Sequence, residues 1–332
     1  MRFEAGENEA GRRLDRVLKK VLRNAPLALV YRIIRKDVKV NGRRVSGETL
    51  LKEGDAVEIF LPDGQIEALG LGRPSVAKAK KQFGVVFEDE SILVVNKPFG
   101  LLTHGDAVEK KNTLANQVVS YLAEKGIYIP GVTKTFAPAP ANRLDRNTTG
   151  LVLFGKALPA ARDLAVMMRG GAEGPAYVEK YYLTVVKGSL KTPLALKARM
   201  IRDEGANVTR VLPSSGEEGR DMVTEVRPLA AGNGFTFVEA KLLTGRTHQI
   251  RAQLADAGYP VVGDRKYGDA AANRMVSEKY ELTTQLLHAY RLTVVCGAAS
   301  LEYLKGKTFR AEPPARFAEI AEGLGCCMKM KL

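Results

Sequence analysis

The chain has 332 residues, of which 45% are hydrophobic and 27% charged, and its formal net charge is +14. That composition is ordinary for a soluble globular protein, and the length is enough for two domains with separate cores. A basic excess of this size predicts a polyanionic partner, with nucleic acid ahead of an anionic membrane surface. No apolar run approaches the roughly 20 residues of a membrane span, and the polar residues 1–9 do not resemble a secretory signal.

Cysteine and histidine are few and are spread along the chain. Cys326 and Cys327 are adjacent, a geometry unsuited to an ordinary structural disulfide, and Cys296 lies far from both. The spacing of the three histidines gives no support to a zinc site. We therefore expect reduced thiols in a cytoplasmic protein and no metal centre.

Residues 11–58 have the pattern of a small basic module. Apolar residues recur with helical spacing on either side of Pro26, which predicts two short helices. Asn41-Gly42 then stands between alternating residues, a strong hairpin signal, and another short strand is expected over 57–61. The module holds 13 Lys or Arg against 6 Asp or Glu, which is half of the chain's positive excess. Because this excess is one-sided, phosphate contacts are favoured over a merely solvated surface.

Residues 62–82 are predicted to be a linker, because Pro and Gly recur in them together with a short lysine run. The lysines fit an RNA contact and a plain tether equally well. A hairpin is expected over 85–95, and it leads into the sequence N-K-P-x-G at residues 96–100. The Pro and Gly of this motif favour a structural role for it, and Lys97 is its one candidate RNA contact.

The functional prediction centres on a polar loop at residues 142–150, which runs into an apolar strand at 151–154. A loop that enters a buried strand holds its polar groups at the edge of a rigid sheet, where functional groups are common. Asp145 lies in this loop between Arg143 and Arg146. A solvated ion cluster would have the same local pattern, so the loop alone does not assign catalysis.

More elements and two more motifs are expected after this loop. The stretch 190–234 indicates only short strands and polar loops. The motifs are K-x-Y, formed by Lys180 and Tyr182, and G-R-T-H-Q-I-R at residues 245–251. Hydrophobic periodicity predicts helices over 113–122, 157–168 and 317–324, and strands over 178–188 and 235–242.

The loop at 142–150 resembles the catalytic loop of the RluA-type pseudouridine synthases, whose usual form is H-R-L-D-R-D-T-S-G. It departs from that form at Asn142, Asn147 and Thr149, and the position of the family's catalytic aspartate falls on Asp145. The motifs N-K-P-x-G, K-x-Y, G-R-T-H-Q-I-R and a late L-H-A strand also resemble the family's motifs and occur in the family's order. Chance does not readily produce such a series.

The resemblance implies an α+β pseudouridine synthase fold, in which a mixed, mainly antiparallel sheet is flanked by helices. Residues 1–61 are similar to the small α/β RNA-binding domain first known from ribosomal protein S-four. The implied organisation is an RNA-binding domain at 1–61, a linker at 62–82 and a catalytic domain at 83–325.

The resemblance also implies residue roles. Asp145 would be the catalytic carboxylate, which either attacks the base or the sugar directly or stabilises a cationic sugar. Arg251 would pair with Asp145, and Tyr182 would lie against the uracil. Arg143 would fill the gap that the extracted base leaves in the RNA. Weaker candidates for contacts with the RNA backbone are Arg146, Arg246 and Lys97.

The implied reaction is the isomerisation of specific uridines in structured RNA, with large-subunit ribosomal RNA as the favoured substrate. It needs no metal, redox cofactor or phosphate donor, so no cofactor is expected. A membrane or an obligatory protein partner is not expected either. Two alternatives stay open, namely a non-catalytic RNA-binding or ribosome-assembly factor and the same chemistry on transfer RNA. The identity of the uridines, the chemical route of Asp145 and the oligomeric state also stay open.

Overall fold

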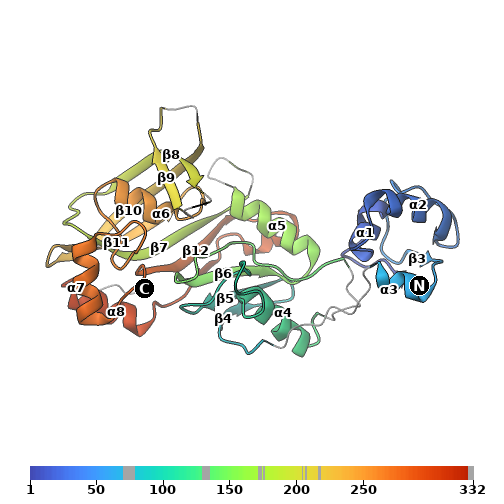
Figure 1. Cartoon of the computed structure of the whole chain (residues 1–332), viewed down its shortest axis with the longest axis horizontal. Coiled ribbons are helices and arrows are strands. Elements are labelled where there is room, and N and C mark those ends of the chain that lie inside the picture. The colour runs from blue at the N-terminus through green and yellow to red at the C-terminus, as the bar shows by residue number, and fades with distance from the viewer. Residues whose placement is uncertain are drawn as a thin grey trace. The chain divides into compact units, whose positions relative to one another are not determined.

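The structure, a computed structural model, divides into two compact units (Figure 1). The first contains Met1–Lys81, Ala115–Ala139 and Gly155–Arg162, and the second contains Gln82–Leu114, Pro140–Phe154 and Asp163–Leu332. The residues that the structure describes are 1–69, 79–128, 135–170, 174, 176–203, 205, 208–215 and 218–327.

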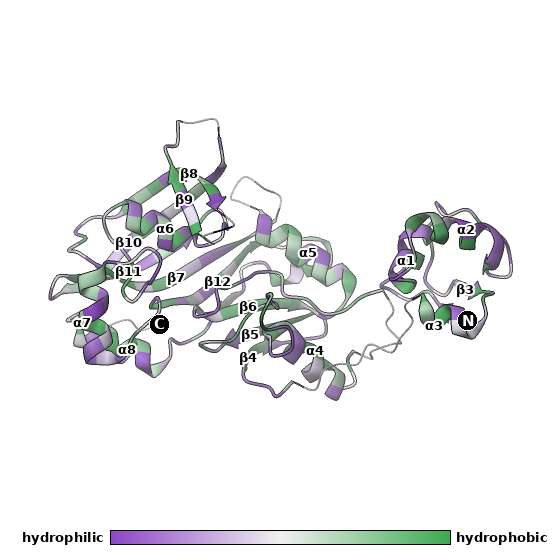
Figure 2. Ribbon diagram, in the orientation of Figure 1, coloured by the Kyte–Doolittle hydropathy of each residue, from purple (hydrophilic) through white to green (hydrophobic). Residues whose placement is uncertain are grey.

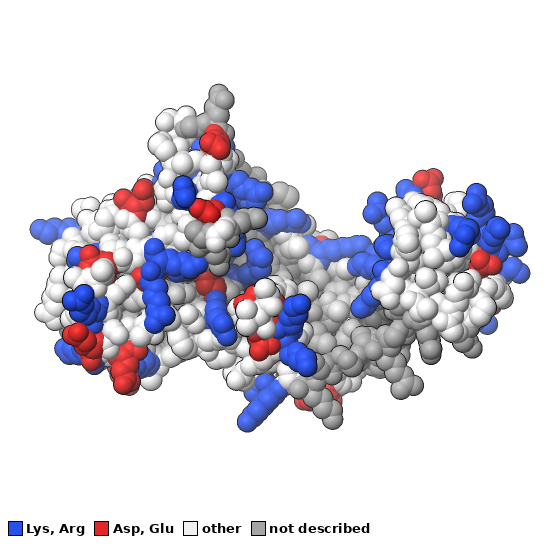
Figure 3. All heavy atoms as spheres, in the orientation of Figure 1, with Lys and Arg blue, Asp and Glu red and all other residues white. Residues whose placement is uncertain are grey.

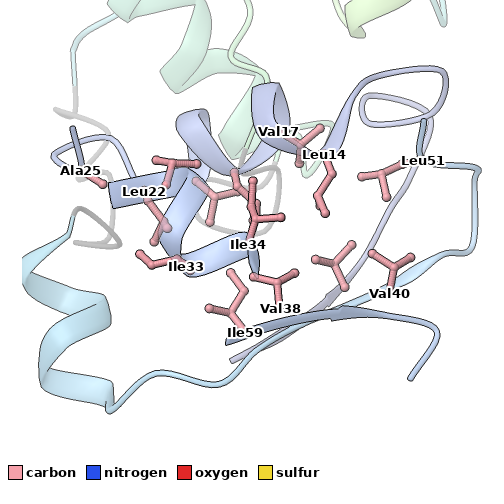
Figure 4. Packing of buried hydrophobic residues seen from close by; sticks show 14 of the residues in the cluster. Leu14, Val17, Leu22, Ala25, Ile33, Ile34, Val38, Val40, Leu51 and Ile59 are labelled. Carbon is pink, nitrogen blue, oxygen red and sulfur yellow. The ribbon is translucent and has the colours of Figure 1, made fainter. Parts of the chain in front are cut away.

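The N-terminal part of the first unit pairs a three-stranded antiparallel sheet, of order β1-β3-β2, with two helices. Each helix buries its predicted apolar face, so both predicted helices are confirmed. Figure 4 shows these side chains meeting Val38, Val40 and Ile59 of the sheet. Burial of each such aliphatic side chain contributes about 1.5–3 kcal/mol, which stabilises so small a core. The elements are β1 (Arg2–Glu4), α1 (Leu14–Val21), α2 (Leu27–Asp37), β2 (Val38–Val40) and β3 (Ala56–Ile59).

The predicted turn at Asn41-Gly42 is present, but the strand expected to return from it is not. Asn41 and Gly42 have φ angles of 51° and 75°, as a tight hairpin turn requires. Pairing then stops after one bridge, between Val40 and Arg43, and β2 instead pairs with β3. The reason is burial: β3 brings Val57 and Ile59 into the core, whereas Arg43 is exposed to solvent.

A short helix, α3 (Asp63–Ala68), occupies the start of the segment that was predicted to be a linker. The backbone N–H groups of Gln65 and Ile66 donate to the carbonyl of Pro62, which closes the first turn. Ile66 is 5% exposed, and its burial stabilises this helix. The Pro and Gly residues around it had favoured a linker in the sequence analysis. Residues 70–78 of the predicted linker lie outside the described part of the chain.

The second unit is built on a ten-stranded sheet of order β4-β5-β6-β12-β7-β11-β10-β8-β9, with β13 paired to β12. Strands β6 and β12 pair in parallel, whereas the registers of β12 with β7, of β7 with β11 and of β11 with β10 are antiparallel. The α+β class with a mixed, mainly antiparallel sheet is therefore confirmed. The strands are β4 (Gly84–Glu88), β5 (Ile92–Lys97), β6 (Thr149–Gly155), β7 (Tyr177–Lys187), β8 (Leu194–Asp203), β9 (Val208–Leu212), β10 (Arg220–Gly232), β11 (Phe235–Leu242), β12 (Leu287–Cys296) and β13 (Thr308–Arg310).

Strands β8 and β10 are longer than the short strands that were expected over 190–234. They span 10 and 13 residues and pair from Arg220 opposite Met200 to Val226 opposite Leu194. Neither strand buries a continuous apolar run, so the local sequence is a weak signal. Their length comes from cross-strand pairing, which a single segment does not reveal.

The buried centre of the sheet positions the functional loop. All seven residues of β6 are buried, which confirms the strand predicted at 151–154, and Figure 2 shows hydrophobic residues along it. Helix α6 packs against β9 and β10. None of the described helices combines the length and the hydropathy that crossing a membrane requires. The remaining helices are α4 (Leu114–Glu124), α5 (Leu158–Arg169), α6 (Gln249–Asp256), α7 (Ala270–Tyr280), η1 (Ala299–Leu304) and α8 (Ala315–Gly323).

Candidate active site

The loop that leads into β6 opens onto a small pocket in the second unit. The wall opposite the loop comes from β7, from the N-terminal turn of α6 and from the loop before α6. Folding thereby joins Asp145 to Arg251, which is 106 positions later in the chain. The pocket is lined by Arg143, Leu144, Asp145, Thr148, Tyr182, Leu242, Arg246, His248, Gln249, Ile250, Arg251 and Leu287.

Asp145 and Arg251 form an ion pair at this pocket. Arg251 Nη1 donates to Asp145 Oδ2 at 2.8 Å. The side chain of Arg251 is 6% exposed and that of Asp145 is 26% exposed, so the carboxylate still reaches the pocket. A guanidinium cannot lose its proton at physiological pH, so it supplies a permanent positive charge beside the carboxylate. The predicted pair of Asp145 with Arg251 is present.

A second carboxylate, Asp264, holds Arg251 from its other side. Arg251 Nε donates to Asp264 Oδ2 at 2.6 Å and Nη2 to Oδ1 at 2.8 Å, a bidentate pair. Burial works to raise the pKa of Asp264, but its hydrogen bonds and ion pair with Arg251 outweigh this and lower the pKa. Burial would likewise lower the pKa of Arg251, and Asp264 and Asp145 together raise it. Arg251 is thus fixed between two carboxylates, with only one of them facing the pocket.

Sequence reasoning did not assign a role to Asp264. The side chain is fully buried, and the backbone N–H groups of Lys266 and Tyr267 also donate to Oδ1. Its position just after the buried residues Val261 and Val262 is the one local signal, because a charged residue there needs a partner. Which arginine provides that partner is visible only in the folded chain.

His248 lies beside Asp145 at the start of α6. Its Nε2 is 3.9 Å from Asp145 Oδ2, and its Nδ1 is hydrogen-bonded to Tyr267 Oη at 2.9 Å. Burial lowers the pKa of His248 below its ordinary value, the charge of Asp145 opposes that shift, and Arg251 adds to it. The ring is therefore mainly neutral at neutral pH, which suits a positioning role. Its φ of 56° marks a sharp change of chain direction before the helix.

Tyr182 of β7 forms an aromatic wall of the pocket. The residue is 9% exposed. Burial, and next the charge of Asp145, raise the pKa of its phenol, so the hydroxyl group keeps its proton at neutral pH. The lysine of the same K-x-Y motif, Lys180, is buried and donates to the carbonyl of Met168. Tyr182 therefore faces the pocket, whereas Lys180 holds the backbone of α5 at Met168.

Arg143 and Arg246 lie exposed on the rim of the pocket. Arg246 Nε donates to the carbonyl of Asp221 at 3.2 Å, and its backbone N–H donates to Gln249 Oε1 at 2.9 Å. These bonds leave both Nη groups of Arg246 available for another acceptor in the described surroundings. Both predicted arginines are accessible to a ligand that enters the pocket.

Lys97, the predicted RNA contact of the N-K-P-x-G motif, lies inside the protein in this structure. The side chain is fully buried, and Nζ donates to the carbonyls of Pro98 at 3.2 Å, Leu101 at 2.8 Å and Arg146 at 3.0 Å. Burial lowers the pKa of Lys97 to about 7, against the opposing charge of Asp145. Lys97 therefore ties the loop of Asp145 to the end of β5.

Two of the three departures from the family's loop have structural roles. Asn142 Nδ2 donates to the carbonyl of Leu151 at 3.1 Å, and its Oδ1 accepts from the N–H of Leu153 at 3.0 Å. Thr149 Oγ1 is hydrogen-bonded to Nδ1 of the buried His288 at 2.7 Å. Both bonds join the loop to the sheet, so the departures support the position of Asp145 without entering the pocket.

The described residues contain no group of three or more His, Cys, Asp or Glu side chains arranged to hold a metal ion. The two carboxylates nearest the pocket's arginine, Asp145 and Asp264, are both paired with Arg251. What the pocket offers chemically is one accessible carboxylate between a fixed cation and an aromatic wall. Such a site can attack an electrophilic carbon or stabilise a developing positive charge.

Comparison with known proteins agrees with this geometry. Residues 91–256 match the family model described as RNA pseudouridylate synthase. A curated relative from Vibrio vulnificus, named ribosomal large subunit pseudouridine synthase C, is 32% identical over 290 residues, 85% of this chain and 84% of its own. The protein of the same name from Escherichia coli strain K12 is 30% identical over 332 residues, 97% of this chain and 93% of its own.

A solved structure is similar in fold. Human RNA pseudouridylate synthase domain containing 4 superposes with a TM-score of 0.54 at 21% identity, covering 73% of this chain and 93% of that one. The family match spans the loop of Asp145, the strand of Tyr182 and the helix of Arg251. The chain therefore belongs to the RNA pseudouridylate synthase family, as an RluA-type member of these uridine-isomerising enzymes.

Proposed function

We propose that this protein converts specific uridines of large-subunit ribosomal RNA to pseudouridine, with Asp145 as its catalytic carboxylate. The observation that carries the proposal is the 2.8 Å pair of Asp145 with the buried Arg251 at an open pocket. The substrate is supported by the names of relatives that align with most of the chain. The alternative is the same reaction on transfer RNA, and the experiment must distinguish transfer RNA from ribosomal RNA as the substrate.

The reaction breaks the bond between ribose C1′ and uracil N1 and forms a bond between C1′ and uracil C5. The proton on C5 is lost and N1 gains one, so atoms and charge balance without an oxidant or a phosphate donor. Asp145 assists either by covalent attack on the base or the sugar or by stabilising a cationic sugar. Arg251 holds the carboxylate in place on either route, and Asp264 in turn holds Arg251.

The target base has to leave the RNA stack before Asp145 can reach it, at a cost of about a few kcal/mol. In the proposal the uracil lies against the ring of Tyr182, between the apolar side chains of Leu242 and Leu287. Arg143 on the rim occupies the gap in the stack, where its planar guanidinium can also contact phosphate. Arg246 contacts the RNA backbone beside the pocket.

The N-terminal domain, proposed at residues 1–61, contributes RNA affinity. Its net positive charge and its exposed arginines support this role, among them Arg32, Arg35, Arg43 and Arg44. The linker at 62–82 and the catalytic domain at 83–325 complete the proposed division. Such an enzyme acts on ribosomal RNA in the cytoplasm and needs no protein partner for catalysis.

The test replaces Asp145 with Asn, which keeps the shape of the side chain and removes the carboxylate. Wild-type protein is mixed with unmodified large-subunit ribosomal RNA without cofactor, and pseudouridines are mapped chemically. Asp145→Asn should lower the rate at least about 10³-fold, the size expected when a nucleophile or a charge stabiliser is lost, with RNA binding largely intact. Asp256→Asn, an exposed aspartate at the end of α6, is the matched control.

The results separate the alternatives. Full activity of Asp145→Asn would refute the catalytic assignment. Wild-type protein that binds the ribosomal RNA but yields no pseudouridine would support a non-catalytic assembly factor. If only transfer RNA were modified, the substrate would be transfer RNA and the proposed chemistry would be unchanged.

A further inference from the structure

A second hollow adjoins the active-site pocket and shares Arg143 and Arg246 with it. Its walls come from the end of β8, from the start of β10 and from the loop 245–247. These strands add two more arginines, Arg202 and Arg220. We call this hollow the arginine groove, because four guanidinium groups line it.

Three of the four cations of the arginine groove are poorly balanced by carboxylates in the described part of the protein. Among the described residues, no carboxylate oxygen lies within 4.0 Å of the guanidinium groups of Arg143, Arg220 or Arg246. Two of the side chains donate to neutral groups: Arg202 Nη1 to Thr247 Oγ1 at 3.0 Å, and Arg246 Nε to the carbonyl of Asp221 at 3.2 Å. Because each guanidinium has five N–H donors, most of the hydrogen-bonding capacity of Arg143, Arg220 and Arg246 faces the groove and solvent.

Two glycines lie in the walls of the groove, and each fits a different constraint. A Cβ atom on Gly219 would lie 2.6 Å from the carbonyl oxygen of Met200, and its φ of 90° is one that other residues rarely adopt. A Cβ atom on Gly245 would meet nothing within 4 Å, so open space lies above it. A charged ligand can therefore approach the backbone closely at Gly245. Figure 3 shows Lys and Arg side chains bordering the projection that carries β8 and β9.

We propose that the arginine groove binds phosphates of the RNA strand directly next to the target uridine, with Arg202 and Arg220 as the anchors. This inference rests on the proposed function, because the groove shares Arg143 and Arg246 with the pocket proposed to hold the target base. Arginine matches phosphate geometry with paired N–H donors. Contacts of this kind set the register of the strand and not its sequence, so they decide which nucleotide stands at Asp145.

The binding test uses the full chain with Asp145→Asn, so that no turnover alters the RNA. Arg202→Gln and Arg220→Gln are added together, and the Kd for unmodified large-subunit ribosomal RNA is measured between 50 and 300 mM salt. Each lost phosphate contact should reduce the slope of log K against log salt by about 0.7 to 0.9. Both together should raise the Kd roughly 10-fold or more at 0.1 M salt.

The turnover test uses the same pair of substitutions with Asp145 restored. The KM for RNA should rise with the Kd, while kcat at saturating RNA stays within about twofold, because phosphate contacts position the strand without joining the chemistry. The effect should persist when the bases that flank the target are changed. Arg202→Lys with Arg220→Lys keeps the charge and should restore most of the salt slope.

The control pair, Arg274→Gln with Arg310→Gln, removes the same charge from exposed positions on α7 and β13. A salt slope and a KM equal to those of this control pair would overturn the inference, as would a loss of kcat at unchanged Kd. Failure of the proposed function looks different: wild-type protein forms no pseudouridine, whereas the binding arm still reports on the groove. Thermal unfolding of each variant checks that the fold is kept. If the Gln pair unfolds, Arg202→Gln and Arg220→Gln are measured singly, and each should reduce the salt slope by about 0.7 to 0.9.

Discussion

Arg251 is the residue through which the active site is assembled. Its guanidinium uses Nε and Nη2 for the buried Asp264 and Nη1 for the accessible Asp145. Because the bidentate pair fixes the plane of the guanidinium, the direction of Nη1 is fixed too. The position of Asp145, the carboxylate proposed as catalytic, therefore depends on a residue that does not face the pocket.

Asp264→Asn should separate this positioning role from catalysis itself. Breaking this buried ion pair leaves the positive charge of Arg251 without its full counter-charge. We therefore expect a loss of about 3–5 kcal/mol in the free energy of unfolding. The rate of pseudouridine formation should fall as well, because Nη1 loses its fixed direction. Denaturant unfolding and turnover on ribosomal RNA measure the two effects.

The control for Asp264→Asn is Asp203→Asn, whose partner Arg210 is largely exposed. A surface pair of that kind contributes at most about 1 kcal/mol. Equal destabilisation by the two substitutions would contradict the role given to Asp264.

Through Lys97, we expect the stability of the protein around the loop of Asp145 to depend on pH. Burial lowers its pKa from 10.5 to about 7, so between these pH values the unfolded chain binds more protons at Lys97 than the folded chain does. Stability from this group therefore rises as the pH increases from 7 towards 10.5. The unfolding free energy of the wild type minus that of Lys97→Met should therefore become more positive as the pH rises, by up to about 1.4 kcal/mol per pH unit.

Denaturant unfolding of both proteins at pH 7, 8 and 9 measures that difference. Other groups titrate alike in the two proteins and cancel. If the unfolding free energy of the wild type minus that of Lys97→Met stayed constant or fell with rising pH, Lys97 would keep its full charge in its buried site.

At the scale of elements, the parallel pair of β6 and β12 supports the loop of Asp145. Gly150 is paired with Ala289, has a φ of 111°, and a Cβ atom there would lie 2.1 Å from the carbonyl oxygen of Ala289. The two backbones approach so closely that only glycine fits. Asp145 lies five residues before this contact, so the strand pair determines where the loop emerges.

Gly150→Ala should force β6 and β12 apart. We expect a loss of about 2–5 kcal/mol in unfolding free energy from overpacking and backbone strain together, and a fall in kcat. Gly64→Ala in α3 is the control, since a Cβ atom there meets nothing within 4 Å and alanine favours a helix. If both variants unfolded at the same denaturant concentration, the close approach would not constrain the sheet.

At the scale of the whole molecule, positive charge is spread over both units, and RNA affinity should depend on both. Arg43 and Arg44 are exposed at the Asn41-Gly42 turn of the N-terminal module. Arg43→Gln with Arg44→Gln should weaken RNA binding and reduce the salt slope by up to about 1.8, with kcat at saturating RNA unchanged. Filter binding across a salt series, with the Arg274 and Arg310 pair as control, measures this. An unchanged salt slope would show that Arg43 and Arg44 of the module do not contact RNA phosphates.

Much of the fold follows from local pattern. Helical spacing in residues 14–22, the Asn41-Gly42 turn and the apolar run at 151–154 each appear in the structure as elements of the predicted kind. These signals are local because a helix face, a turn and a buried strand each need only neighbouring residues. Helix α3 and the long strands β8 and β10 were missed, because their stability comes from packing and pairing with distant segments.

The sequence by itself determined the family's ordered motifs, the α+β class and the candidate pairing of Asp145 with Arg251. Only the tertiary structure decided that Lys97 is buried against three carbonyls, that Asp264 fixes Arg251, and that Arg202 and Arg220 line one groove. The physical reason is distance along the chain. A motif is a property of adjacent residues, whereas burial, ion pairing and the convergence of charge depend on strands that are neighbours only after folding.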